Sequence, residues 1–174
     1  MQTQLPETVN FLRQVELNRT IEGVYSIAKL DRLKQVLHAD AGVVTAKLEF
    51  GRSVGFNCLK GEISAQLLVE CQRCLKPMAT KISGSFKFAL INSEDEIELL
   101  PEEFEPYLLE GDEQSIVDLI EDELLLALPM VLAHDNACSD FMAKQEKTIK
   151  AEKEASHPFA ALKSLKDDLS DKVN

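Results

Sequence analysis

Two cysteines at the end of a strand-like segment form the pattern with the clearest chemical meaning. Cys71 and Cys74 lie three positions apart in the segment 70–77, ECQRCLKP. Two thiolates at this spacing can bind one metal ion from a single tight turn, and a later histidine and cysteine can complete a tetrahedral zinc site. The candidates for these further ligands are His134 and Cys138. The four residues together predict a site for one zinc ion.

Two other interpretations of the cysteine pair stay open. A thiol redox pair would require an easily ionised thiol at a helix N-terminus in a β-α-β setting. Here the pair follows a strand pattern, and no helix pattern follows it. The two cysteines could also pack the turn without binding metal. Cys58, in a strand-like context, is interpreted as a small core residue.

The composition favours a soluble protein with one core. The chain has 174 residues, of which 45% are hydrophobic, enough for a single core and a tail. No apolar run approaches the roughly 20 residues that span a bilayer. The N-terminus has neither the basic nor the apolar region of a secretory signal. We therefore expect a cytoplasmic protein without membrane contact, with thiols that are reduced or bound to metal.

The charge is distributed unevenly. The net charge is −11, yet the segment 94–140 holds 16 of the 30 acidic residues and no Lys or Arg. The rest of the chain has 14 acidic and 19 basic residues. Because phosphate contacts supply most non-specific affinity for nucleic acids, any RNA contact should be confined to one face.

Periodicity predicts an α+β fold. Alternating residues in 43–91, broken by glycines, indicate three or four antiparallel strands. A helical stripe from Ser26 to Leu37 predicts one helix, and residues 115–128 predict a second, which Ser115 begins and Pro129 ends. We expect the second helix to turn Glu121 toward water. The segment 92–113 is expected to be an acidic loop, with anchors at Leu99, Leu100, Phe104 and Tyr107.

The predicted architecture is a small antiparallel sheet that could close into a barrel, flanked by two or three helices. Residues 1–140 should form a single α+β domain, with a β-rich core at 43–91 and an acidic loop and helix at 92–129. Residues 141–174 should form a charged tail with a short amphipathic unit at 158–165. In this unit, Phe159, Leu162 and Leu165 have helical spacing and are candidates for docking on a partner.

Basic residues gather in the predicted sheet and its turns, where they could follow an RNA phosphate backbone. Phe86 and Phe88, which could stack on bases, fall on the apolar side of their strand and are expected in the core. The candidate RNA-binding residues are Lys47, Arg52, Lys60, Arg73, Lys76, Lys81 and Lys87.

The segment 68–77, LVECQRCLKP, resembles the signature of the YceD family of large ribosomal RNA subunit accumulation proteins. Three further segments resemble the family in the same order: 120–129, 134–138 and 158–166. In many relatives the candidate ligands resemble a four-cysteine zinc site more closely, whereas this sequence has one histidine and one cysteine as the candidates in its second half. The resemblance implies a non-enzymatic factor for the accumulation of 23S ribosomal RNA.

Three functions follow from these observations. The first is a ribosome-biogenesis factor that acts on 23S ribosomal RNA or its pre-50S particle. The second is a protein-binding adaptor, whose acidic block and 158–165 unit would dock a basic ribosomal protein or a nuclease. The third is a thiol redox enzyme, which has the least support because no catalytic motif accompanies the cysteines.

Overall fold

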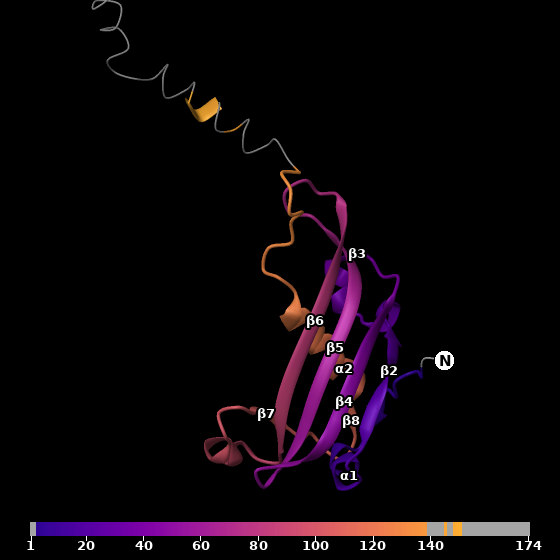
Figure 1. Cartoon of the computed structure of the whole chain (residues 1–174), viewed down its shortest axis with the longest axis vertical. Helices are drawn as coiled ribbons and strands as arrows, with labels where there is room; N and C mark the ends of the chain where they lie inside the picture. The colour runs from indigo at the N-terminus through magenta and orange to yellow at the C-terminus, as the bar shows by residue number, and fades with distance from the viewer. Residues whose placement is uncertain (1–2, 139–144, 146–147, 151–174) are drawn as a thin grey trace, which may run out of the picture. The chain divides into compact units, whose positions relative to one another are not determined.

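The computed structural model describes residues 3–138, 145 and 148–150 of the chain. The chain divides into two units, residues 1–133 and residues 134–174. The strands and helices labelled in Figure 1 belong to the first unit. In the second unit, residues 134–138 are irregular, and residues 145 and 148–150 are helical.

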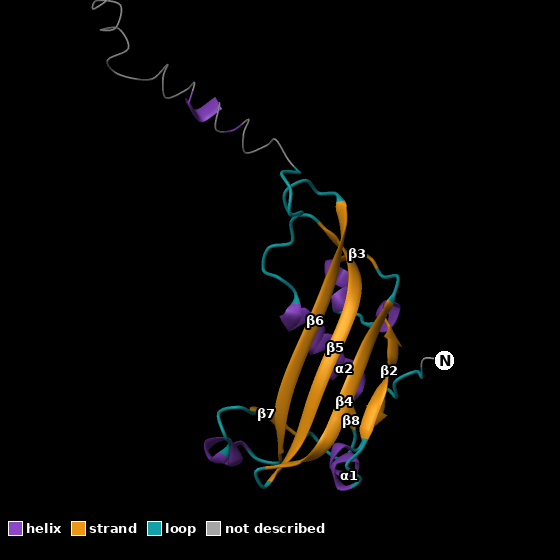
Figure 2. Cartoon of the chain, viewed as in Figure 1, coloured by secondary structure: helices purple, strands orange, loops and turns teal. Residues whose placement is uncertain are grey.

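A six-stranded mixed sheet dominates the first unit (Figure 2). Three long antiparallel strands form its centre, in the region where the sequence predicted them. The strand order is β2-β4-β5-β6-β7. The edge strand β7 pairs with β6 in parallel, and β3 pairs with β5 off this path. The strands are β2 (Thr20–Ser26), β3 (Leu37–Ala39), β4 (Val43–Ser53), β5 (Phe56–Glu70), β6 (Pro77–Ile91) and β7 (Glu105–Leu108).

The smaller elements cover one face of this sheet. Helix α1 (Phe11–Glu16) packs on β4, where the Phe11 and Phe50 rings lie 5.2 Å apart. Helix α2 (Ile116–Ala127) packs on β5 and β6. A second, two-stranded sheet pairs β1 (Thr8–Val9) with β8 (Gln114–Ser115), just before α2. Three short 3₁₀ turns complete the unit: Ile27–Lys29, Leu33–Val36 and Glu94–Leu99.

The predicted fold class is wrong. The sheet is mixed rather than antiparallel, it stays open between β2 and β7, and strands greatly outweigh helices. The parallel strand was missed because Glu105–Leu108 contains Pro106 and lies in an acidic segment. Proline is tolerated on a strand at the edge of a sheet, where its missing N–H costs no ladder hydrogen bond.

The helix predicted from Ser26 is also wrong. Ser26 ends β2 opposite Val43 and makes no side-chain cap. The predicted apolar residues Ile27, Leu30 and Leu33 are fully buried, but they lie in and between two 3₁₀ turns. These apolar residues have helical spacing in the sequence and are buried in the structure, but they do not form an α-helix.

Helix α2 follows the prediction closely. Ser115 caps it, since its hydroxyl accepts a hydrogen bond from the Asp118 N–H at 3.1 Å. Its apolar stripe is buried against the sheet. The prediction that Glu121 faces water is wrong, because its side chain is only 5% exposed.

The acidic segment contains more structure than expected. Phe104 is buried and Tyr107 packs on the main core, as predicted. Leu99 is not an anchor, because it is 70% exposed. Leu100 and Phe104 instead cover Cys58 in a small separate cluster. In the described part of the chain, no helix is both long and apolar enough to cross a membrane.

Candidate functional site

The turn that joins β5 to β6 holds Cys71 and Cys74. The Cys71 N–H donates to the Lys76 carbonyl at 3.0 Å, and the Leu75 N–H donates to the Cys71 carbonyl at 2.8 Å. Leu75 has φ of 58°, in the left-handed region that few residues other than glycine adopt. Cys71 is fully buried and Cys74 partly so. Residues 71–76, called here the cysteine turn, thus fix the spacing of two thiols.

A main-chain hydrogen bond ties this turn to the segment that follows α2. The Gln72 N–H donates to the Leu132 carbonyl at 2.8 Å. His134 is only two residues beyond Leu132 in the chain. Cys74 and His134 are 60 positions apart in the sequence, and the chain between them forms β6, β7 and α2. This path returns Leu132 to the cysteine turn, where it accepts the hydrogen bond from Gln72.

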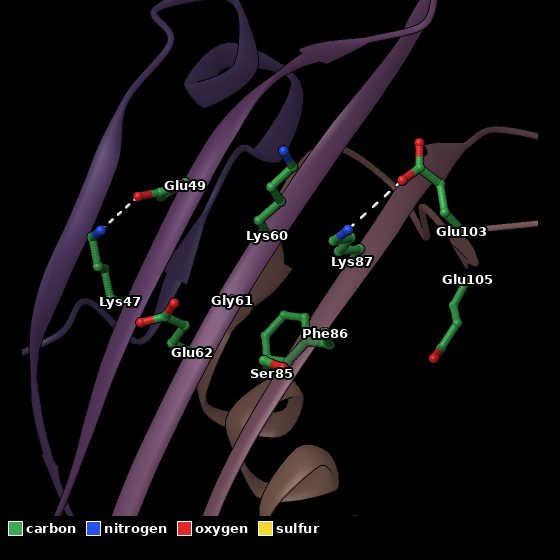
Figure 3. A pocket seen from close by; sticks show the side chains of 10 residues that line it. All are labelled: Lys47, Glu49, Lys60, Gly61, Glu62, Ser85, Phe86, Lys87, Glu103 and Glu105. Carbon is green, nitrogen blue, oxygen red and sulfur yellow. Dashed lines mark ion pairs between the residues drawn. The ribbon is translucent and has the colours of Figure 1, made fainter. Parts of the chain in front are cut away.

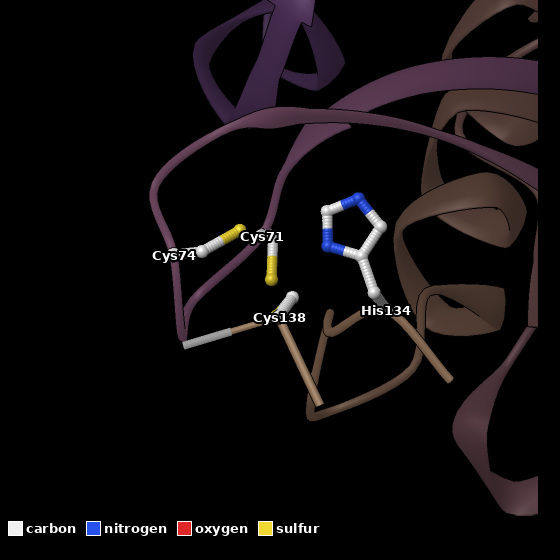
Figure 4. A group of neighbouring side chains, drawn as sticks. All are labelled: Cys71, Cys74, His134 and Cys138. Carbon is white, nitrogen blue, oxygen red and sulfur yellow. The ribbon is translucent and has the colours of Figure 1, made fainter. Parts of the chain in front are cut away.

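The four predicted metal ligands lie together (Figure 4). The Sγ atoms of Cys71, Cys74 and Cys138 and a ring nitrogen of His134 all lie within 4.8 Å of one another. Four ligands at zinc distances of about 2.0–2.3 Å from one ion would be separated by roughly 3.3–3.8 Å. The observed group is therefore compact enough to hold one ion after small side-chain movements.

The chemistry of the donors narrows the choice of metal. Three thiols and one imidazole match the ligands of closed structural zinc sites, and such ligands suit soft or borderline metals rather than Mg²⁺ or Ca²⁺. Four protein ligands leave no open coordination position for a substrate. The cysteine turn leads into β6, so it lacks the helix N-terminus that activates many redox thiols. This arrangement favours a structural metal centre.

The sheet face opposite α2, called here the outer face, carries Lys47, Lys60, Lys81 and Lys87. Each alternates with buried residues of its strand. An open pocket of about 460 Å³ lies on this face, lined by three of these lysines (Figure 3). The other three RNA-binding candidates lie elsewhere. Arg52, near the end of β4, donates to Asn57, while Arg73 and Lys76 are exposed on the cysteine turn.

Acidic residues neutralise much of the outer face. Lys47 pairs with Glu49 at 2.6 Å, and its hydrogen bond lowers the pKa of that carboxyl group. Lys87 lies 3.7 Å from Glu103. Lys60 stands directly between Glu49 and Lys87 in the strand register. Sequence reasoning missed these acids, although Glu49 follows Lys47 at the spacing that keeps both on one face of a strand.

The partner-docking candidates Phe159, Leu162 and Leu165 lie outside the described residues, so the adaptor function stays a prediction.

The prediction that Phe86 and Phe88 belong to the core is confirmed. Both side chains are buried, with their ring centroids 4.8 Å apart.

Comparison with known proteins identifies the family. The family model of the large ribosomal RNA subunit accumulation protein YceD matches residues 59–166, which include the cysteine turn, α2 and all four candidate ligands. The protein of that name from Haemophilus influenzae is 28% identical over 170 residues, covering 94% of this chain and 97% of the relative. No solved structure matches the chain. The family match covers more than half of the chain, and the chain therefore belongs to the YceD family.

Proposed function

We propose that this protein supports the accumulation of 23S ribosomal RNA as a non-enzymatic factor. In this proposal it binds the RNA, or the pre-50S particle that contains it, through the cysteine turn. The name of the Haemophilus influenzae relative, which aligns over nearly the whole chain, supports the role in large-subunit RNA accumulation. The RNA contact is argued from the charges of the turn.

The observation that carries the contact is the pair of exposed cations Arg73 and Lys76 on a turn fixed by its own main chain. Within the described residues, Lys76 forms no ion pair, whereas Lys47 and Lys87 each have an acidic neighbour. Lys76 therefore gives up no ion pair within the described residues when it contacts a phosphate. Phosphate contacts of this kind position a protein on RNA without reading its sequence.

A metal ion in the Cys71, Cys74, His134 and Cys138 site would support this surface. It would hold the turn and the segment at His134 in one arrangement, so that Arg73 and Lys76 meet the RNA with little loss of conformational freedom. The ion would have a structural role and would not contact the RNA.

Binding to 23S ribosomal RNA fragments at several salt concentrations tests the proposal. Arg73→Ala combined with Lys76→Ala should weaken binding. It should also reduce the slope of log K against log salt by about 1.4–1.8, the change expected for two lost phosphate contacts. The matched control is Lys29→Ala with Lys34→Ala, which removes two cations that already pair with Glu7 and Asp31. Equal losses in both double variants would contradict the proposed surface.

Truncation after residue 155 separates this function from the adaptor alternative. If the cysteine turn binds RNA, the truncated protein should keep nearly full RNA affinity. If truncation abolishes rRNA accumulation in cells while RNA affinity is unchanged, the adaptor function is favoured instead.

A further inference from the structure

An exposed leucine stands between the two cations of the cysteine turn. Leu75 follows Cys74, whose place on the turn Figure 4 shows, and lies between Arg73 and Lys76 in the sequence. Its side chain is 68% exposed. Its left-handed backbone, with φ of 58°, is unfavourable for residues other than glycine, because Cβ crowds the following carbonyl oxygen. The turn thus presents a large apolar side chain to water at a position that glycine would fit more easily.

The segment after α2 adds two more exposed apolar side chains. Met130 is 96% exposed and Val131 69% exposed. The hydrogen bond from the Gln72 N–H to the Leu132 carbonyl, 2.8 Å long, brings this segment to the cysteine turn. All of these residues belong to the first unit of the chain. Leu75, Met130 and Val131 are called here the apolar rim, and exposed apolar side chains grouped in this way are typical of interaction surfaces.

The polar groups beside the rim are suited to a nucleic acid. The segment 71–81 contains three basic residues and no acid. Gln72 is exposed, and its side-chain amide can both donate and accept hydrogen bonds, as the edge of a base requires. The surface therefore combines positive charge, an amide and apolar side chains.

The apolar rim discriminates between two kinds of RNA element. In an A-form duplex the bases are paired and stacked, so a protein meets mainly phosphates and 2′-hydroxyl groups. Such a surface offers little to three apolar side chains. An unpaired nucleotide in a bulge or loop exposes the face of its base, which apolar side chains can cover while cations bind the neighbouring phosphates.

We propose that the cysteine turn and the apolar rim bind unpaired nucleotides of the ribosomal RNA. Leu75 and Val131 cover the base, and Arg73 and Lys76 bind the phosphates beside it. This inference rests on the RNA contact proposed above and names the RNA element that this contact takes. Covering a base removes apolar surface from water, so its contribution to affinity depends little on salt, whereas that of a phosphate contact depends strongly on it.

The test uses the full chain and three fluorescein-labelled RNA duplexes of one sequence, followed by fluorescence anisotropy. The first duplex is fully paired, the second has a bulge of adenine nucleotides in one strand, and the third has a bulge of the same length made of abasic nucleotides. The wild type should bind the adenine bulge about tenfold more tightly than either other duplex. The abasic bulge separates contact with a base from the bending that any bulge allows.

Single substitutions locate the contact. Leu75→Ser and Val131→Ser should each lose most of the preference for the adenine bulge, while the slope of log K against log salt stays the same, because no phosphate contact is removed. The matched control is Val54→Ser, which should keep the preference. Val54 is 69% exposed and also has a left-handed backbone, with φ of 52°, but it lies in the turn between β4 and β5.

Leu75→Gly separates binding from folding. Glycine adopts the left-handed backbone without strain, so this variant should be at least as resistant to urea as the wild type. It should nevertheless lose the preference for the adenine bulge, as Leu75→Ser does. Circular dichroism checks that each variant is folded.

The outcomes separate this inference from the proposed function. Equal binding of the three duplexes by the wild type, weakened by Arg73→Ala with Lys76→Ala, would overturn the inference and leave the proposed function intact. No binding to any of these RNAs or to 23S fragments would overturn both. An unchanged preference in Leu75→Ser and Val131→Ser would also overturn the inference, and would assign the apolar rim to another ligand, such as a partner protein.

Discussion

Glu121 and Arg32 are joined by two hydrogen bonds across 89 residues of sequence. The Arg32 N–H donates to Glu121 Oε1 at 2.7 Å, and its side-chain Nε donates to Oε2 at 2.9 Å. The Leu33 N–H also donates to Oε1, at 2.9 Å. A carboxylate only 5% exposed thus binds the N-terminus of the Leu33–Val36 turn and fastens it to α2.

Glu121→Ala should lower the free energy of unfolding by about 2–4 kcal/mol. The substitution leaves the Leu33 N–H buried without its acceptor and removes a charge-assisted pair with Arg32. The matched control is Asp122→Ala, whose carboxylate also pairs with Arg32 but is 55% exposed. It should cost about 0–1 kcal/mol, as exposed ion pairs usually do. Urea denaturation followed by circular dichroism measures both.

Glu121→Gln provides a further check. The amide keeps an oxygen that can accept the two main-chain hydrogen bonds, so this variant should fall between the wild type and Glu121→Ala. Equal small losses for Glu121→Ala and Asp122→Ala would show that the buried carboxylate contributes no more than a surface charge.

The same carboxylate explains why the helix predicted at Ser26 does not form. In a continuous α-helix the N–H groups of Arg32 and Leu33 would bond to carbonyls four residues earlier. Here they bond to Glu121, and Leu30 adopts an extended conformation. The apolar spacing correctly marked which residues are buried. It could not reveal an acceptor that arrives from a distant helix.

Strand β2 was missed for a different reason. Its inward positions are Gly23 and Tyr25, so the glycine interrupts the apolar alternation on which strand prediction relies. The structure requires a glycine there, because a Cβ would collide with the carbonyl oxygen of Thr3. The three central strands and α2 were predictable because their apolar residues keep the local period and face one core.

In the candidate site, too, local features could be predicted from the sequence and long-range contacts could not. The spacing of Cys71 and Cys74 is local and could be read directly from the sequence. The hydrogen bond from Gln72 to Leu132 that closes the distance to His134 has no sequence signal. The pairing of Lys47 with Glu49 had a local signal, since both lie on one face of β4, whereas the pairing of Lys87 with Glu103 depends on the path of the acidic segment.

Leu124 should matter much more than Leu126, although both are leucines in α2. Leu124 is fully buried, whereas Leu126 is 78% exposed. Leu124→Ala should lower the free energy of unfolding by roughly 2–5 kcal/mol through lost burial and a cavity. Leu126→Ala should change it by no more than about 0.5 kcal/mol. Similar small losses, measured by urea denaturation, would mean that α2 does not pack on this sheet.

The purified protein should contain about one zinc per chain, measured by elemental analysis. Cys74→Ser should lower this content and should weaken the thiolate charge-transfer absorption of a cobalt-substituted sample, because it removes one of three sulfur ligands. Cys58→Ser is the matched control. Cys58 lies under Phe104 in a separate cluster, so its loss should leave the metal content unchanged.

The reactivity of the thiols gives a second readout for the same site. Burial raises the pKa of the Cys58 thiol, so Cys58 should react slowly with iodoacetamide in the native protein at neutral pH. Removal of bound metal by a chelator should expose Cys74 to the reagent and leave the rate for Cys58 unchanged. Metal-free protein of full stability, with no change in thiol reactivity on adding zinc, would leave the cysteine pair as a packing feature of the turn.

Gly61 and Phe86 stand opposite each other on β5 and β6, and the Phe86 ring covers the glycine. A Cβ at Gly61 would overlap the outer atoms of this ring, which is 94% buried and has its centroid 4.8 Å from that of the tilted Phe88 ring. Gly61→Ala should therefore destabilise the protein by about 1–3 kcal/mol, as expected for overpacking in a core.

Gly84 on β6 is the matched control for this substitution. A Cβ there would meet Ile63 at 3.4 Å and Ala127 at 3.6 Å, which are ordinary contact distances. Gly84→Ala should therefore be neutral, or stabilising by about 0.4–1 kcal/mol, because alanine restricts the unfolded chain more than glycine does. Combining Gly61→Ala with Phe86→Leu should cost less than the sum of the two single losses, since the smaller side chain makes room for the new methyl group. Additive losses, or a Gly84→Ala variant as unstable as Gly61→Ala, would contradict the contact between the ring and the glycine.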